Sequence, residues 1–108
     1  MKNAMKNNMK STLEMNESLT HIGVSMGQIY AQLQRTGWDH ERQTSTYRSI
    51  LIIEGHKIVD DDRQTGTGLP SMKKAMAETL RCCADRCPRV RTNRIKHELR
   101  WMADRLSM

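Results

Sequence analysis

The sequence of residues 19–33 is LTHIGVSMGQIYAQL, and it contains the clearest periodic pattern in the chain. Apolar side chains recur there at alternating spacings of three and four residues, which would place them along one side of a helix. This apolar line consists of Leu19, Ile22, Met26, Ile29 and Leu33. We therefore predict a helix that begins near Ser11 and ends at Gly37, with the apolar line on its buried side.

The apolar line also resembles the seam of a short coiled coil. It spans little more than two heptads, which is short for an independent coiled coil but sufficient inside a dimer or an intramolecular bundle. We accordingly expect a homodimer in which these residues mediate self-association, with packing inside one chain as the alternative.

The pattern is ambiguous at residues 47–59, where the continuous apolar run at residues 50–53 precedes Glu54 and Gly55. We favour a β-hairpin, because Gly55 can occupy the first central position of a two-residue turn. That turn would place Glu54 opposite Lys57 as a cross-strand pair. A helix is the alternative, since periodicity cannot decide so short an apolar run.

Two further helices are predicted towards the C-terminus. Ser71 can cap a helix that runs to Cys87 and is stopped by Pro88. The apolar side of this helix consists of Met72, Met76, Leu80, Cys83 and Cys87. A final helix from about Val90 to Leu106 would bury Ile95, Leu99, Met102 and Leu106.

Length and composition favour one small domain. The chain has 108 residues, which is the size of a single domain. Leu, Ile and Val number only 18 and Phe is absent, so the nine Met residues must help to fill the core. We expect a mainly α fold of about three to four helices, with one β-hairpin at about 47–59. Residues 11–108 would form this domain, behind a flexible basic segment at residues 1–10.

The net charge of +6 is concentrated at the two ends of the chain. Residues 1–10 carry +3, residues 11–80 carry −2 and residues 81–108 carry +5. The basic C-terminal segment suits an anionic partner, because arginine pairs bidentately with phosphate or carboxylate.

The last predicted helix carries an aromatic residue beside its arginines. On a helical wheel, Arg94, Trp101 and Arg105 fall within about 40° of one another, away from the predicted core. Trp supplies a stacking or anchoring surface to a partner. We predict a nucleic-acid or partner binding site at Arg89, Arg91, Arg94, Lys96, Arg100, Trp101 and Arg105. The alternative is that Trp101 packs on the hairpin or the first helix.

The cysteines favour reduced thiols over a metal site. Cys82, Cys83 and Cys87 lie within one predicted helix and lack the second cysteine pair that a structural zinc site needs. Cys83 and Cys87 also lie on its apolar side, where a free cysteine packs as a small hydrophobic residue. We therefore predict no bound metal.

The polar residues do not converge on a catalytic site. The histidines at positions 21, 40, 56 and 97 form no metal pair and accompany no nucleophile motif. The run at residues 60–62 lacks the alternating order of a calcium loop, so we expect a solvated acidic loop. Residues 66–68 are too short for a phosphate-binding loop. We predict no catalytic residue, no cofactor and no enzyme activity.

The sequence also lacks the features of a membrane or secreted protein. No run approaches the ~20 apolar residues of a membrane span, and residues 1–10 are too polar for the core of a signal peptide. We expect a cytoplasmic protein that does not enter a membrane.

These observations predict a small, non-enzymatic regulatory protein. It would bind nucleic acid or a nucleic-acid-containing complex through its Arg-rich C-terminal helix, mainly by phosphate contacts. The alternative is a small adaptor or inhibitor that binds a larger protein through its Met-rich helix faces and Trp101, like many accessory proteins of phages and plasmids.

Overall fold

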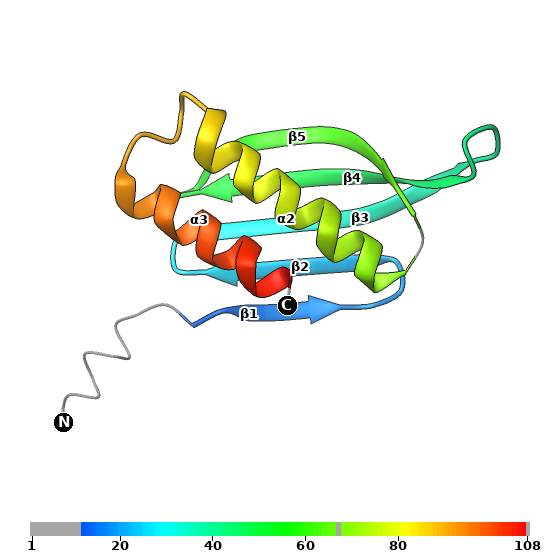
Figure 1. The fold of residues 1–108 in the computed structure, drawn as a ribbon, viewed down its shortest axis with the longest axis horizontal. Coiled ribbons are helices and arrows are strands. Elements are labelled where there is room, and N and C mark those ends of the chain that lie inside the picture. The colour runs from blue at the N-terminus through cyan, green and yellow to red at the C-terminus, as the bar shows by residue number, and fades with distance from the viewer. Residues whose placement is uncertain (1–11, 67, 108) are drawn as a thin grey trace.

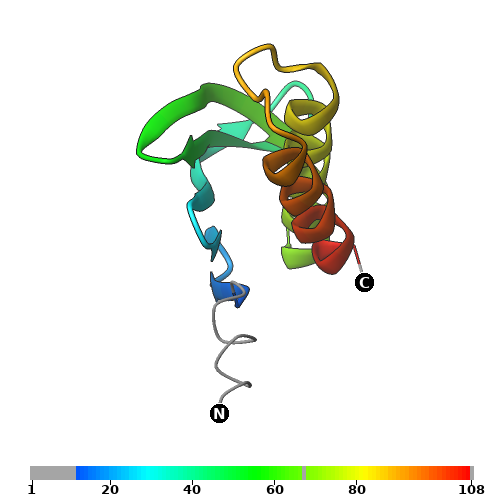
Figure 2. The same cartoon turned by 90° about the vertical axis from the view of Figure 1, so that its left-hand side faces the viewer.

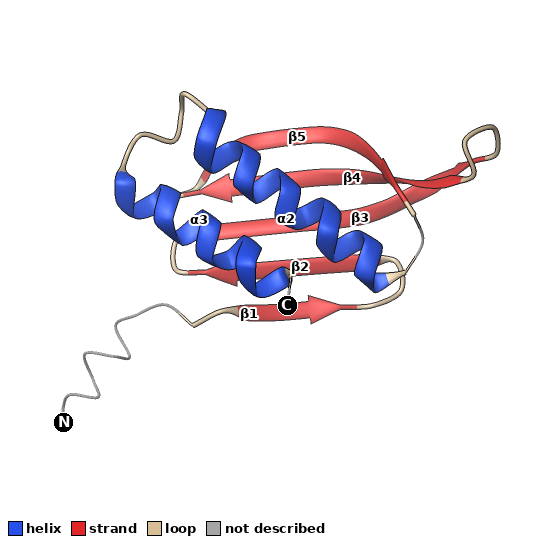
Figure 3. Ribbon diagram, in the orientation of Figure 1, coloured by secondary structure: helices blue, strands red, loops and turns tan. Residues whose placement is uncertain are grey.

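Five antiparallel strands precede two helices in the computed structural model of the protein (Figure 1 and Figure 3). The structure describes residues 12–66 and 68–107. The strands are β1 (Glu14–Glu17), β2 (His21–Met26), β3 (Ile29–Asp39), β4 (Thr44–Ile53) and β5 (His56–Thr65). The helices are α2 (Leu69–Arg86) and α3 (Asn93–Leu106). The order of strands in the sheet is the order in the chain, so the sheet is a simple meander.

The mainly α fold predicted from the sequence is wrong, because residues 19–33 form two strands rather than one helix. The buried residues alternate along each strand: Ile22, Val24 and Met26 on β2, and Ile29, Ala31 and Leu33 on β3. The two-residue turn at Gly27 and Gln28 shifts this alternation by one position. Ile22, Met26, Ile29 and Leu33 are therefore four, three and four residues apart, which is also the spacing of apolar residues on one side of a helix.

The helical seam predicted for self-association is wrong for the same reason. Four of its five residues are buried in the core of this one chain. The fifth, Leu19, lies between β1 and β2 and is 77% exposed. A homodimer stays a prediction without assigned residues.

The predicted hairpin at residues 47–59 is present as the part of the longer β4–β5 pair that lies next to its turn. Its turn differs from the prediction by one residue, because Glu54 and Gly55 are both central residues and Ile53 pairs with His56. Both turn residues have positive φ, 52° and 82°, as a type I′ turn requires. Lys57 consequently lies opposite Ile52 and not opposite Glu54.

Both predicted C-terminal helices are present, but their starts differ from the prediction. Ser71 does not cap α2, which begins at Leu69 after Gly68 and has no side-chain cap, and α3 begins three residues after Val90. α3 begins at Asn93 because the Thr92 hydroxyl accepts a hydrogen bond from the backbone N–H of Ile95 at 3.3 Å. Their predicted apolar residues are buried, apart from Cys87, which is half-buried. Neither helix of the described chain is long and apolar enough to cross a membrane.

The helices cover one face of the sheet only, as Figure 2 shows. The core lies between the two layers, where the inward residues of β2, β3 and β4 meet the buried sides of α2 and α3. Tyr30, Gln32, Ile50 and Ile52 alternate with the buried positions and lie on the other face. The sheet thus has a covered apolar face and a mixed open face.

Candidate functional site

The positive charge of the described residues lies on the helical layer. Residues 68–107 carry ten basic and four acidic side chains, whereas residues 12–66 carry five basic and eight acidic ones. The net charge is therefore +6 for the helical layer and −3 for the sheet. The N-terminal lysines, Lys2, Lys6 and Lys10, lie outside the described residues.

The main cluster of exposed arginines surrounds the link between the two helices. We name this set the basic connection; it consists of Arg86, Arg89, Arg91 and Arg94. All four side chains are exposed, and none forms an ion pair with a carboxylate of the described chain. Their guanidinium groups are therefore available to an external anion.

A buried residue and two hydrogen bonds to backbone oxygens fix the position of the basic connection. Val90 is buried in the core between Arg89 and Arg91. One N–H of the Arg89 guanidinium donates to the backbone oxygen of Lys57 in β5 at 3.2 Å, and Nε of Arg91 donates to the backbone oxygen of Pro88 at 3.4 Å. A guanidinium has five donors, so most of them stay free for a ligand.

The rest of the predicted site lies along α3 and is less uniform. Arg100 is tied to the neighbouring helix, since its Nη2 lies 2.7 Å from Oδ1 of Asp85. Lys96 and Arg105 form no ion pair among the described residues. The guanidinium of Arg105 lies 5.4 Å from the ring centroid of Trp101, within range of a cation–π interaction.

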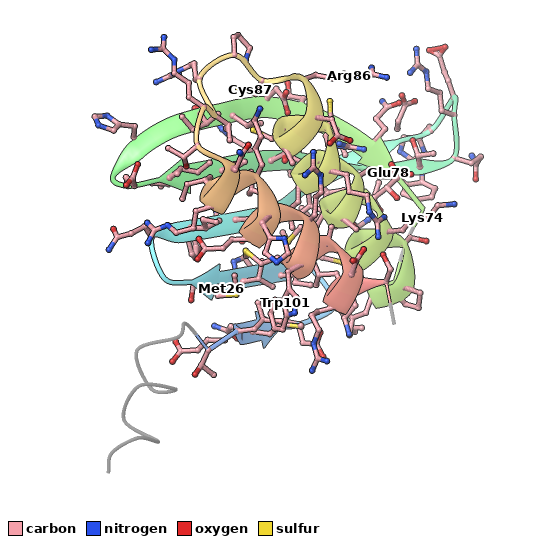
Figure 4. The ribbon with its side chains drawn as sticks, turned by 60° about the vertical axis from the view of Figure 1, so that its left-hand side comes forward. Met26, Lys74, Glu78, Arg86, Cys87 and Trp101 are labelled. Carbon is pink, nitrogen blue, oxygen red and sulfur yellow. The ribbon has the colours of Figure 1, made fainter. Side chains whose placement is uncertain are left out.

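Trp101 is separate from the basic connection. Its side chain is 41% exposed, and Figure 4 shows it on the side of α3 near the β2 end of the sheet, opposite Arg86 at the end of α2. Arg86, Arg89, Arg91 and Arg94 follow one another along the α2–α3 link. Arg86 was not among the residues predicted from the sequence, because that prediction was confined to residues 89–105. The structure divides the predicted site into the basic connection and an aromatic flank, which we define as Trp101 and Arg105.

The three thiols are free and lie at the end of α2. Cys82 is exposed, Cys87 is half-buried and Cys83 is buried in the core. Burial, and then the neighbouring thiols, raise the pKa of Cys83 to about 12. Within residues 12–66 and 68–107 no group of His, Cys, Asp or Glu is arranged to hold a metal ion.

Comparison with known proteins assigns no family. No protein-family model, curated protein or solved structure matches the chain. The function is therefore inferred from the chemistry of its own side chains.

The acidic run at residues 60–62 belongs to β5 and is not the solvated loop predicted from the sequence. Arg48 donates two hydrogen bonds to the carboxylate of Asp60, at 2.7 and 2.9 Å, and Lys57 donates a third at 3.0 Å. These bonds, with those from Arg48 largest, lower the pKa of Asp60 to about 2.

This ion pair predicts a pH-dependent contribution to stability. The folded pKa of Asp60 lies below the unfolded value of about 3.9, so the contribution is complete above that value and is lost as the pH falls from about 4 to 2. We expect Asp60→Asn to lower the melting temperature at pH 7, and the difference from wild type to shrink towards pH 2. Thermal denaturation of both proteins at several pH values measures this difference in melting temperature. Asp62→Asn is the control, because Asp62 has no ion pair among described residues; a difference for Asp60→Asn that is independent of pH would contradict the prediction.

Proposed function

We propose that the protein acts by binding nucleic acid, or a complex that contains it, through the basic connection, and that it is not an enzyme. The observation that carries this proposal is the cluster of four exposed arginines without a carboxylate partner in the described chain. Such groups bind phosphate with charge-assisted, bidentate hydrogen bonds. Phosphate contacts would therefore dominate the affinity over contacts to base edges.

The separation of charge between the two layers supports the same proposal. A helical layer of +6 above a sheet of −3 would turn the helices, and not the sheet, towards a polyanion. The N-terminus of α3 adds partial positive charge beside Arg94, because its first N–H groups point out of the helix. We also propose a cytoplasmic location, where free thiols such as these three are reduced by default and disulfides form only transiently.

A protein partner is the second candidate function. It rests on the aromatic flank, because exposed Trp and Arg side chains are frequent anchors of protein interfaces. The methionines of the helices do not add to it, since Met72, Met76 and Met102 are buried in the core. An adaptor would therefore lose its partner in a Trp101→Ala variant, whereas nucleic-acid binding through the basic connection would persist.

The binding proposal is tested by fluorescence anisotropy of labelled duplex and single-stranded oligonucleotides, titrated from low to physiological salt. We expect Arg91→Glu with Arg94→Glu to weaken binding about 100-fold at about 50 mM salt, and to reduce the slope of log affinity against log salt by about two phosphate contacts. The wild-type affinity itself should fall steeply with salt.

The matched control changes the same charge at the other end of the molecule. Arg35→Glu with Arg42→Glu alters two exposed arginines near the β3–β4 turn, which lies opposite the α2–α3 connection (Figure 1). This control should bind like the wild type. An equal loss in both double variants would show an effect of net charge alone, and absence of wild-type binding at about 50 mM salt would overturn the proposal.

A further inference from the structure

All three cysteines line one pocket between β5 and the C-terminal half of α2. Its volume is about 280 Å³, and its lining residues are Val59, Asp61, Arg63, Thr79, Cys82, Cys83, Arg86 and Cys87. Val59 and the thiols supply an apolar part. Of the charged lining residues, Arg63 is paired with Glu78 at 3.2 Å and Asp61 is acidic, so Arg86 is the arginine of the lining that has no ion pair among the described residues. Figure 4 shows Arg86 and Cys87 together at the end of α2 that lies near β5.

Two of the thiols form a pair. Cys83 and Cys87 are one helical turn apart, and the backbone N–H of Cys87 donates to the backbone oxygen of Cys83 at 3.2 Å. After burial, the neighbouring Cys87 thiol is the next cause of the raised pKa of Cys83. Cys83 is 4% exposed and Cys87 is half-buried, so a reagent in the pocket reaches Cys87 more easily.

The backbone at Cys87 can adapt to a covalent bond. Cβ atoms one helical turn apart are usually about 5–6 Å from each other, whereas a disulfide needs about 3.5–4.5 Å. Cys87 is the C-cap of α2, with an extended backbone (φ −78°, ψ 117°), and lies outside the helix. A shift of about 1–2 Å at this residue would act on the last hydrogen bond of α2, from the Cys87 N–H to the Cys83 oxygen, and on the bond from the Val90 N–H to the Cys87 oxygen.

We propose that this pocket is a thiol modification site, at which a small anionic disulfide oxidises Cys83 and Cys87 to an intramolecular disulfide. The guanidinium of Arg86 attracts the anionic reagent, and the apolar part of the pocket accepts its disulfide group. The class of reagent is a low-molecular-weight disulfide with carboxylate groups, such as oxidised glutathione.

The chemistry proceeds in two exchange steps. The Cys87 thiolate attacks one sulfur of the reagent, forms a mixed disulfide and releases the first small thiol, which takes up a proton. Cys83, which keeps its proton until this stage because its pKa is about 12, then attacks the Cys87 sulfur, and its proton passes to the departing thiolate of the reagent. The second small thiol leaves, so the protein has lost two electrons and two protons, and the reagent has been reduced to two thiols.

Cys82 is excluded from this pair by its position. It is exposed and adjacent to Cys83 in α2, and neighbouring side chains of a helix point about 100° apart. A Cys82–Cys83 bond would require the helix to unwind. Cys82 would instead keep a mixed disulfide, because no second thiol can displace it within the helix.

The disulfide would alter the basic connection. The backbone oxygen of Cys87 accepts a hydrogen bond from the N–H of Val90 at 3.1 Å, so a shift of Cys87 moves the turn that carries Arg89. An effect on nucleic-acid binding rests on the proposed function, whereas formation of the disulfide does not.

The experiment uses the folded Cys82→Ser variant, treated with oxidised glutathione at neutral pH and analysed by intact mass. We expect a mass lower by two hydrogen atoms, no glutathione adduct, and return to the starting mass with dithiothreitol. Peptide mapping should place the bond between Cys83 and Cys87. The matched control, Cys82→Ser with Cys83→Ala, should retain one glutathionyl group on Cys87, because the second step is absent.

Other products would overturn the proposal. These are a stable glutathione adduct on the Cys82→Ser variant, a disulfide-linked dimer, or no reaction of the folded chain under conditions in which the urea-unfolded chain reacts. Far-UV circular dichroism confirms that both variants are folded, and the result for Cys82→Ser alone decides the question if the double variant does not fold.

Discussion

The Leu33→Asp variant is expected to lose the cooperative unfolding transition of the wild type, whereas Leu19→Asp should keep it. Leu33 is fully buried on β3 beneath the helices. A carboxylate there has no partner, and an uncompensated buried charge costs several kcal/mol, comparable with the total stability of about 5–15 kcal/mol of such a domain. Leu19 is mostly exposed, where substitutions change stability by about 0.5 kcal/mol or less.

Thermal denaturation followed by far-UV circular dichroism measures both variants, with gel filtration as a second observable. The pair separates the observed sheet from the helical seam predicted by the sequence, since both residues belong to that seam. Dissociation of a dimer by Leu19→Asp, or a native-like melt of Leu33→Asp, would contradict the sheet and favour the seam.

Truncation of Leu99 in α3 should lower the free energy of unfolding by about 3 kcal/mol in a Leu99→Ala variant. Leu99 is fully buried in the core, so its removal takes apolar surface from the core and leaves a cavity. Trp101→Ala is the matched comparison on the same helix. It removes a partly exposed ring and a cation–π contact, for a loss of about 1 kcal/mol.

Urea denaturation monitored by circular dichroism provides these free energies, because the signal does not depend on the Trp101 ring. Equal losses for the two variants would show that Trp101 is a core residue. The aromatic flank would then have no basis as a protein-binding surface, although the basic connection would be unaffected.

The two helices could be predicted because their local patterns agree with their tertiary packing. Pro88 follows the end of α2, and the apolar residues of both helices recur at helical spacing. The helix starts were predicted less well, since Thr92 caps α3 and Gly68 precedes α2. The presence of the β4–β5 hairpin could also be predicted, from the apolar run and Gly55. Its register could not, because Glu54 adopts a positive φ of 52°, which is uncommon for residues other than glycine.

The first three strands could not be predicted by spacing alone. The turn at Gly27, with φ 59°, joins the alternating apolar residues of β2 and β3. It places Met26 and Ile29 three residues apart, as in a helix. The residue that indicates the turn is Gly27, because glycine at the first central position is typical of a hairpin turn. It stands between two alternating apolar runs, Ile22, Val24, Met26 and Ile29, Ala31, Leu33. Gly37, predicted as the end of a helix, lies inside β3 beside a register shift.

The positive charge of the candidate site could be predicted from the sequence, but the pairing and exposure of its individual arginines could not. The excess of arginine after residue 80 is visible in the sequence. That Arg100 is paired depends on Asp85, which belongs to the other helix, and such a contact cannot be derived from the pattern of one helix. The exposure of Arg86 likewise depends on how α2 crosses the sheet.

The meander also determines the order in which the domain can assemble during synthesis. Every strand pairs only with its neighbours in the chain, so each hairpin closes through a short turn and can form before the next strand is complete. The sheet can therefore grow from its N-terminal end as the chain leaves the ribosome. The helices that shield Ile22, Leu33 and Leu51 are translated after the sheet. A nascent chain that has completed its sheet thus still exposes the apolar face to water, which makes this stage the one most dependent on chaperones.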